Sequence, residues 1–287
     1  MRVALVGTGR MGAAMARRLS GAGFDLVLFN RTRETAEAVA GRTGAAVAPT
    51  ARAAGSSADV CLVSLADDAA LLSTYAGTDG LVAGLQPGAV VCETSTVHPA
   101  TVRELAPLIA GREATLLDCP VSGSVPLVER GELTVMVGGD EAALSRARPL
   151  LDAFATRVFH LGDVGAGATM KLVVNALLGA LNVAVSEAVV LAERAGLDRE
   201  TVYDVFEAGA AGAPYVRYKR SAFLRPEETP VAFSLDLVAK DQALIHRLAS
   251  EVGARMDQGE TNRRLVAEAL AAGLGQSDMS TLAQFLR

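Results

Sequence analysis

The chain has 287 residues, enough for two domains of ordinary size, and 51% of them are hydrophobic, so a sizeable core can be buried. Its formal net charge is −5, and it has neither a basic cluster nor a stripe of mixed aromatic and basic residues, which argues against nucleic acid as a partner. Lysines make up only three of the 27 basic side chains: Lys171, Lys219 and Lys240. Because lysine can lose its proton at usable pH and arginine cannot, each lysine is a candidate for proton transfer.

The cysteines and histidines indicate no metal centre. Cys61, Cys92 and Cys119 lie far apart in strand-like runs, without metal-ligand spacing, and are odd in number for a disulfide framework. We interpret them as small buried side chains in a reducing compartment. The three histidines share no spacing, so neither a metal site nor a Ser-His-Asp triad is supported. With no signal peptide and no apolar run of about 18 residues or more, we expect a cytoplasmic protein with no membrane partner.

Strand and helix patterns alternate through residues 1–160. Short apolar runs predict strands at 3–6, 26–29, 60–65, 90–92, 115–117 and 134–137, with helical stretches between most of them. This alternation indicates an α/β fold in which a mainly parallel, Rossmann-type doubly wound sheet is covered on both faces. It predicts a dinucleotide-binding domain over residues 1–162.

From residue 166 onward only helical periodicity remains. We expect helices at about 166–195, 198–208, 233–251, 257–272 and 279–286, which form an all-helical substrate and dimerisation domain over residues 163–287. The first of these helices is apolar almost all round, so it should be buried between domains or subunits. A homodimer or homotetramer is the assembly we expect.

A glycine-rich turn follows the first strand. The segment Gly7-Thr8-Gly9-Arg10-Met11-Gly12 fits G-x-G-x-x-G between a strand and a helix, the context that gives this short pattern its value. Gly7 allows the tight turn, Gly9 lets the backbone approach a pyrophosphate, and Gly12 permits close helix–strand packing. The free N–H groups of the helix N-terminus then favour a dinucleotide phosphate over a plain structural turn.

The end of the second strand indicates which dinucleotide is bound. An NAD enzyme usually carries an acid there for the ribose 2′-hydroxyl, but this chain has Asn30-Arg31-Thr32. Arg31 can pair with a 2′-phosphate while Asn30 and Thr32 donate hydrogen bonds. The alternative interpretation of Arg31 is a solvated side chain at the start of a helix, without a role in cofactor binding. We therefore expect NADP, with NAD as a possible second cofactor.

Several motifs in order resemble the β-hydroxyacid dehydrogenase family, which includes 3-hydroxyisobutyrate dehydrogenase, tartronate semialdehyde reductase and the glyoxylate/succinic semialdehyde reductases. The motifs are GTGRMGAAMARRL at the start, ETST at 93–96, DCPVSGS at 118–124, GAGATMKLVVN at 165–175 and FSLDLVAKD at 233–241. The resemblance covers nearly the whole chain. It implies hydride transfer between a nicotinamide cofactor and a small carboxylate-bearing alcohol or aldehyde.

The resemblance also implies roles for individual residues. Lys171 matches the catalytic acid/base, Asn175 helps to hold the substrate, and Ser122 and Gly123 lie in the segment that binds its carboxylate. On the cofactor side, Lys240 lies by the cofactor, and the two loops beside the nicotinamide end match the pairs Leu65-Ala66 and Ser95-Thr96. The chain departs from the family pattern at Ser124, Pro126-Leu127 and Val174, which bears on the substrate more than on the reaction.

Physical chemistry points to the same residues. Lys171 and Asn175 are four apart on the long helix and so share a face, where two polar groups on an apolar helix need partners. A partly buried lysine near a positive nicotinamide should have a lowered pKa, which suits it to proton transfer. The hydroxyl and N–H groups of Ser122 and Gly123 suit a carboxylate.

Each of these assignments has a structural alternative. Asn175 and Lys171 can be an interhelical hydrogen bond beside a lysine whose charged end reaches solvent. Ser122 and Gly123 can be a tight turn, and Lys240 can be half of a surface ion pair. Two other functions also remain. An imine reductase of the same fold usually lacks the lysine found at 171, and a non-catalytic cofactor-binding regulator would need no acid/base.

Overall fold

The structure is a computed structural model that describes residues 1–287 and divides into two compact units. Unit 1 is Met1–Lys171 and unit 2 is Leu172–Arg287. The domain division expected at residues 162 and 163 stays a prediction.

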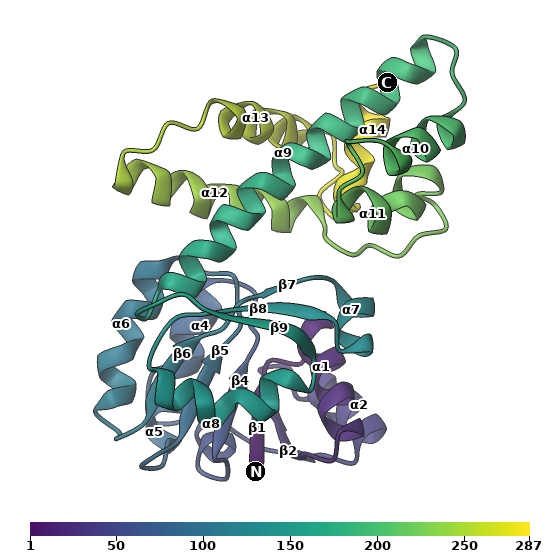
Figure 1. Ribbon diagram of the computed structural model, residues 1–287. Coiled ribbons are helices and arrows are strands. Elements are labelled where there is room, and N and C mark those ends of the chain that lie inside the picture. The colour runs from purple at the N-terminus through teal and green to yellow at the C-terminus, as the bar shows by residue number, and fades with distance from the viewer. The chain divides into compact units, whose positions relative to one another are not determined.

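A six-stranded, fully parallel sheet forms the centre of unit 1 (Figure 1). Its strands are β1 (Arg2–Val6), β2 (Asp25–Phe29), β3 (Ala46–Val47), β4 (Val60–Val63), β5 (Val90–Glu93) and β6 (Thr115–Asp118). They lie in the order β3-β2-β1-β4-β5-β6, which is the Rossmann order and confirms the expected fold class. In such sheets ligands bind outside the carboxyl ends of the strands, where the order reverses, here between β1 and β4.

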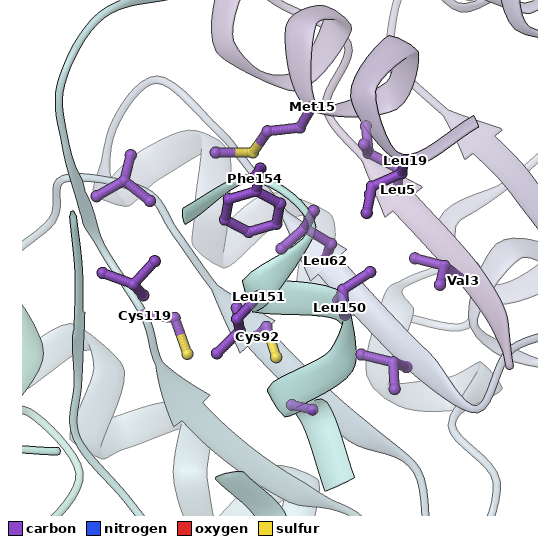
Figure 2. Packing of buried hydrophobic residues seen from close by; sticks show 14 of the residues in the cluster. Val3, Leu5, Met15, Leu19, Leu62, Cys92, Cys119, Leu150, Leu151 and Phe154 are labelled. Carbon is purple, nitrogen blue, oxygen red and sulfur yellow. The ribbon is translucent and has the colours of Figure 1, made fainter. Parts of the chain in front are cut away.

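Alternation along each strand gives the sheet two apolar faces. In β1, Val3 and Leu5 belong to one core cluster, whereas Ala4 and Val6 belong to the other. The first face is covered by α1 (Arg10–Gly21), α2 (Arg33–Thr43) and α8 (Glu141–Asp152), and the second by α3 (Ala51–Gly55), α4 (Asp68–Tyr75), α5 (Leu81–Gly84) and α6 (Pro99–Ala110). Figure 2 shows Met15 of α1 beside Phe154 in the first cluster.

A second, three-stranded sheet follows in unit 1. It contains β7 (Val121–Ser122), β8 (Leu133–Val137) and β9 (Ala155–His160), with α7 (Val125–Arg130) between β7 and β8. The pair β7–β8 is antiparallel and the pair β8–β9 is parallel. The sequence patterns missed β9 because exposed residues such as Phe159 and His160 break its apolar alternation.

Unit 2 contains helices and no further strand, as expected. The long α9 (Ala166–Arg194) begins in unit 1 and continues into unit 2, and the other elements are α10 (Arg199–Ala208), α11 (Pro214–Leu224), α12 (Leu235–Val252), α13 (Asp257–Ala271), the 3₁₀ helix η1 (Met279–Thr281) and α14 (Leu282–Phe285). Their buried side chains form one apolar cluster around Tyr203, Val189 and Leu282.

A buried ion pair crosses the core of unit 2. The Lys219 side chain in α11 is 2% exposed, and its Nζ donates to Asp278 Oδ1 at 2.6 Å and Oδ2 at 2.8 Å. Asp278 Oδ2 also accepts from the backbone amides of Ala232 and Phe233. Burial lowers the pKa of Lys219, and the Asp278 carboxylate opposes that shift. Losing one partner of such a pair would leave an uncompensated buried charge.

Helix α9 is less buried than its composition suggested. Large apolar side chains remain exposed along one stripe of it, with Val173 at 55%, Leu177 at 63% and Leu191 at 72%. The helix is long and apolar enough to cross a membrane by length and composition, a test that the core helix of a water-soluble protein also passes. Its other side is fixed in unit 2, where Asn182 Nδ2 donates to the carbonyl of Met279 at 2.9 Å.

Candidate active site

The glycine loop lies at the carboxyl end of β1. Gly7 has φ +94°, and a Cβ on it would lie 2.1 Å from the carbonyl oxygen of Ser64, which follows β4. A Cβ on Gly12 would lie 2.0 Å from the carbonyl oxygen of Gly7. Both positions therefore require glycine for the fold itself, Gly7 for backbone conformation and close approach and Gly12 for packing.

Gly9 differs, because a Cβ on it would meet no protein atom within 4 Å. It is the N-cap residue of α1, and the first turn of that helix has neither a side-chain cap nor an acidic residue. The neighbouring Thr8 is 2% exposed, and its Oγ1 has no hydrogen-bond partner within the protein. Uncapped amides, open space and an unpaired hydroxyl fit a bound pyrophosphate. Arg10 and Met11 complete the loop at the start of α1.

Asn30 ties the end of β2 to this loop. Its Oδ1 accepts from the Thr8 amide at 3.0 Å, and its Nδ2 donates to the Thr32 carbonyl at 2.9 Å. Asn30 thus shapes the turn and has less capacity for a ligand than expected. Arg31 is exposed, and Thr32 is the N-cap residue of α2, without a side-chain cap bond.

The ends of β4 and β5 are joined by Ser95. Its Oγ accepts from the Leu65 amide at 2.7 Å, and the Ser95 side chain is buried. This bond brings together the two loops that the family resemblance assigned to the nicotinamide end. Ala66, which follows Leu65, is exposed, and Thr96, which follows Ser95, is half-buried.

Asp118, at the end of β6, fastens the start of α9. Its Oδ1 accepts from the Gly165 amide at 2.8 Å and its Oδ2 from the Ala168 amide at 2.7 Å. Burial raises the pKa of Asp118, and these amide bonds oppose the shift. Lys171 is half-buried and follows Ala168 by three residues, so its position in unit 1 is fixed by Asp118.

Ser122 ends the short strand β7, which begins three residues after Asp118, and Gly123 follows it directly. The Pro120 carbonyl accepts from the Met136 amide at 3.0 Å, while a Cβ on Gly167 would lie 2.5 Å from the Met136 carbonyl oxygen. The segment with Ser122 and the first turn of α9 therefore flank the same residue of β8. Gly123 has φ +133°, a backbone conformation that only glycine adopts readily.

A second polar group lies in unit 2. Asn175 Nδ2 donates to Asp241 Oδ2 at 2.5 Å, and Lys240 Nζ forms an ion pair with Asp241 Oδ1 at 2.9 Å, without the alignment of a hydrogen bond. Asp241 is 3% exposed. Its carboxylate thus orients both polar residues that the sequence had singled out in this unit.

The sequence interpretation missed the three acids that hold the site residues: Glu93, Asp118 and Asp241. A signal existed for each. Glu93 and Asp118 end apolar strands, where a buried acid is unusual. Asp241 lies on the buried stripe of α12 with Val238 and Ile245.

The comparisons with known proteins agree with this geometry. A family model described as the NAD-binding domain of 6-phosphogluconate dehydrogenase matches residues 2–162. A second, described as the NAD-binding domain of NADP-dependent 3-hydroxyisobutyrate dehydrogenase, matches residues 165–286. The two matches together span nearly the whole chain, so the chain has the two domains of an NAD(P)-dependent dehydrogenase.

Relatives define the family more closely. A probable mitochondrial 3-hydroxyisobutyrate dehydrogenase of Dictyostelium discoideum is 31% identical, over 99% of this chain and 90% of the relative. An NAD-dependent L-serine dehydrogenase of Pseudomonas aeruginosa is 31% identical over 98% and 96%. The solved Mycobacterium tuberculosis 3-hydroxyisobutyrate dehydrogenase with L-serine has a TM-score of 0.88 at 31% identity and covers both chains fully.

The chain belongs to the β-hydroxyacid dehydrogenase family, and it is an NAD(P)-dependent oxidoreductase of hydroxy acids. An imine reductase from Myxococcus stipitatus, at 18% identity and a TM-score of 0.65, shares the fold alone.

The glycine loop gives a direct test of the phosphate cradle. Gly9→Ala should leave thermal unfolding unchanged, because its methyl group meets open space, but should weaken NADPH binding about tenfold or more by obstructing the pyrophosphate. Gly12→Ala is the matched control and should lower the free energy of unfolding by about 1–3 kcal/mol through overpacking. Fluorescence titration and thermal melts measure both effects. Full NADPH affinity in Gly9→Ala would place the phosphates elsewhere.

Proposed function

We propose that the protein interconverts a small β-hydroxy acid and its semialdehyde, with Lys171 as the acid/base. The observation that carries this is the Asp118 carboxylate, which binds the Gly165 and Ala168 amides. It fixes the first turn of α9, and with it Lys171, to the end of β6, from which the segment with Ser122 continues.

The chemistry requires one proton transfer beside the hydride transfer. Bound nicotinamide supplies the hydride acceptor in oxidation and the hydride donor in reduction. In oxidation, the Lys171 amine accepts the proton of the substrate hydroxyl as the C–H bond breaks and the carbonyl forms. In reduction, the Lys171 ammonium returns that proton to the carbonyl oxygen. Arginine could not take this role, because it keeps its proton.

The other polar residues hold the substrate and the cofactor. Ser122 and Gly123 offer a hydroxyl and backbone N–H groups to the substrate carboxylate. Asn175 holds the substrate beside Lys171, one helical turn away on α9, while Lys240 lies by the cofactor. Asp241 fixes the orientation of Asn175 and Lys240.

The names of the relatives suggest the substrate class. One is an L-serine dehydrogenase, and others are named for 3-hydroxyisobutyrate. Both compounds carry a primary alcohol two carbons from the carboxylate carbon, which places a hydroxyl and a carboxylate at a fixed short separation. We propose this pattern for the substrate of the present chain, with the side group at the middle carbon left open.

Substitution of Lys171 tests the proton transfer. Lys171→Ala should reduce turnover by about 10²–10⁴-fold, the usual contribution of a positioned acid/base. Lys171→Arg keeps the charge but should be nearly as slow. NADPH affinity should change little in either variant, because the phosphates bind the glycine loop. Turnover is followed by NADPH absorbance with a panel of small hydroxy acids and semialdehydes.

Near-normal turnover in Lys171→Arg would make the lysine an electrostatic clamp for the substrate. Near-normal turnover in Lys171→Ala would exclude α9 as the seat of proton transfer.

We propose NADP as the preferred cofactor, through Arg31. No acid ends β2, and the exposed Arg31 side chain follows the strand directly, where a 2′-phosphate would lie. NAD remains the second candidate, since one relative is named as NAD-dependent and one family description as NADP-dependent.

Arg31→Asp should weaken NADPH binding about tenfold or more and spare NADH, since a charge-assisted phosphate contact is replaced by repulsion. Arg42→Asp makes the same change of charge at the far, exposed end of α2 and should leave both affinities intact. Fluorescence titration with both reduced cofactors is the measurement. Equal losses for NADPH and NADH in Arg31→Asp would remove the basis for NADP preference.

We also propose that the chain assembles as a homodimer or homotetramer through α9. Val173, Leu177 and Leu191 form an exposed apolar stripe that a second copy of the same helix can cover.

The free, buried thiols of Cys61, Cys92 and Cys119 fit a reducing compartment. We propose that this compartment is the cytoplasm, which fractionation of cells would test.

Light scattering should give a multiple of the 29.6 kDa chain mass. Leu177→Glu should shift that mass toward a single chain, because it places a charge in the apolar stripe. Leu108→Glu, at an exposed position on α6, is the matched control and should leave the measured mass unchanged. A wild-type mass of one chain would contradict the assembly.

A further inference from the structure

Glu93 is a buried carboxyl held by two hydrogen bonds, one to each oxygen. It ends β5 and is 1% exposed. The Tyr75 hydroxyl of α4 donates to its Oε2 at 2.8 Å, and the Ser95 amide donates to its Oε1 at 2.9 Å. The carboxyl thus links α4 to the loop that follows β5.

The contacts continue from Ser95 to the glycine loop. Ser95 Oγ accepts from the Leu65 amide at 2.7 Å, which fixes the loop after β4. The preceding Ser64 carbonyl lies against Gly7, where even a Cβ would approach within 2.1 Å. A series of contacts that begins at the Glu93 carboxyl therefore joins the carboxyl ends of β5, β4 and β1, all within unit 1.

We propose that Glu93 is a positioning residue for the nicotinamide end of the cofactor: its carboxylate holds Ser95, and Ser95 holds Leu65. This inference rests on the proposed placement of the nicotinamide beside these two loops. Glu93 touches neither cofactor nor substrate and acts through Ser95.

The energetics favour a role beyond stability. Burial raises the pKa of Glu93 to about 7, with the nearby Asp118 adding to the rise and the bonds from Ser95 and Tyr75 opposing it. The other titratable groups near Glu93 are the thiols of Cys61 on β4, Cys92 on β5 and Cys119 after β6. For an acid whose pKa is raised on folding, stability is full at low pH and declines as the pH rises toward 7. Ionised Glu93 therefore costs stability, and a neutral amide would fold at least as well.

The same titration gives the proposal its pH signature. Above about pH 7 the carboxylate accepts from Ser95 and Tyr75 as a charged group, and its bonds are strongest. Below that pH it is protonated and the hold on Ser95 weakens. Affinity for the nicotinamide end should therefore fall as the pH is lowered from 8 to 6.

The test compares two ligands in the full-length protein by calorimetry at pH 6, 7, 8 and 9. NADP⁺ carries the nicotinamide, whereas 2′-phospho-ADP-ribose lacks it and keeps the same titrating 2′-phosphate. Glu93→Gln should weaken NADP⁺ binding at pH 8 about fivefold. It should also remove the part of the affinity loss toward pH 6 that NADP⁺ shows and 2′-phospho-ADP-ribose does not. Binding of 2′-phospho-ADP-ribose should match wild type at every pH, and the melting temperature at pH 8 should be equal or higher.

Two further variants separate positioning from structure. Tyr75→Phe removes a donor that lowers the Glu93 pKa, so it should move the midpoint of the NADP⁺ pH dependence upward. Thr94→Val removes the bond from Thr94 Oγ1 to the Val63 carbonyl at 2.6 Å, which also bridges β5 to β4 but does not involve Glu93. It should lower the melting temperature and leave the midpoint where it is.

The failures are distinguishable. If Glu93→Gln binds NADP⁺ with wild-type affinity and pH dependence while Gly9→Ala is impaired, the cofactor cradle stands and the role of Glu93 is wrong. If Glu93→Gln weakens both ligands equally and melts lower, Glu93 is only structural. If Gly9→Ala also binds normally, the placement of the cofactor itself fails.

Discussion

The site depends first on one buried carboxylate, that of Asp118. Two backbone amides at the start of α9 donate to it, so the sheet edge and the helix are joined by charge-assisted hydrogen bonds rather than by apolar contact alone. These amides belong to the helix end that has no intrahelical partner for them. The carboxylate therefore satisfies the helix terminus and fixes its origin. Lys171 lies in the next turn, where little rotation or translation remains.

The same edge of the sheet carries a second acid in register with the first. Glu93 of β5 pairs with Asp118 of β6, and the backbone amide of Cys119 donates to the Glu93 carbonyl at 2.7 Å. Glu93 holds the loop after β5, where we propose the nicotinamide end, and Asp118 holds the start of α9, where we propose the acid/base. The two buried carboxyls lie on neighbouring strands, and the charge of Asp118 adds to the rise in the pKa of Glu93, an arrangement that apolar packing would avoid.

Local patterns predicted the fold and the glycine loop well, because their information lies within a few residues. The Rossmann-type sheet followed from apolar runs, and Gly7 and Gly12 followed from spacing that sterics then justified. Predictions failed where a polar residue occupies a buried stripe. In α11 the buried positions are Tyr215, Val216, Lys219, Ala222 and Phe223, and the lysine in the middle hides the helical period. The buried stripe of α12 marks Asp241 as unusual, but its role was not predictable, since only the tertiary structure brings Asn175 to it.

The ion pair between Lys219 and Asp278 has a consequence for the order in which the chain folds during synthesis. Unit 1 is complete when Lys171 has been made, so it can fold while translation continues. Unit 2 cannot fold at that stage, because the Lys219 ammonium must enter the apolar core together with its counter-charge, and Asp278 follows 59 residues later. A nascent chain therefore carries a finished unit 1 ahead of a helical unit whose core closes only after Asp278 has been made. A stop just before Asp278 would leave Lys219 without its counter-charge and that core open, while unit 1 stayed intact.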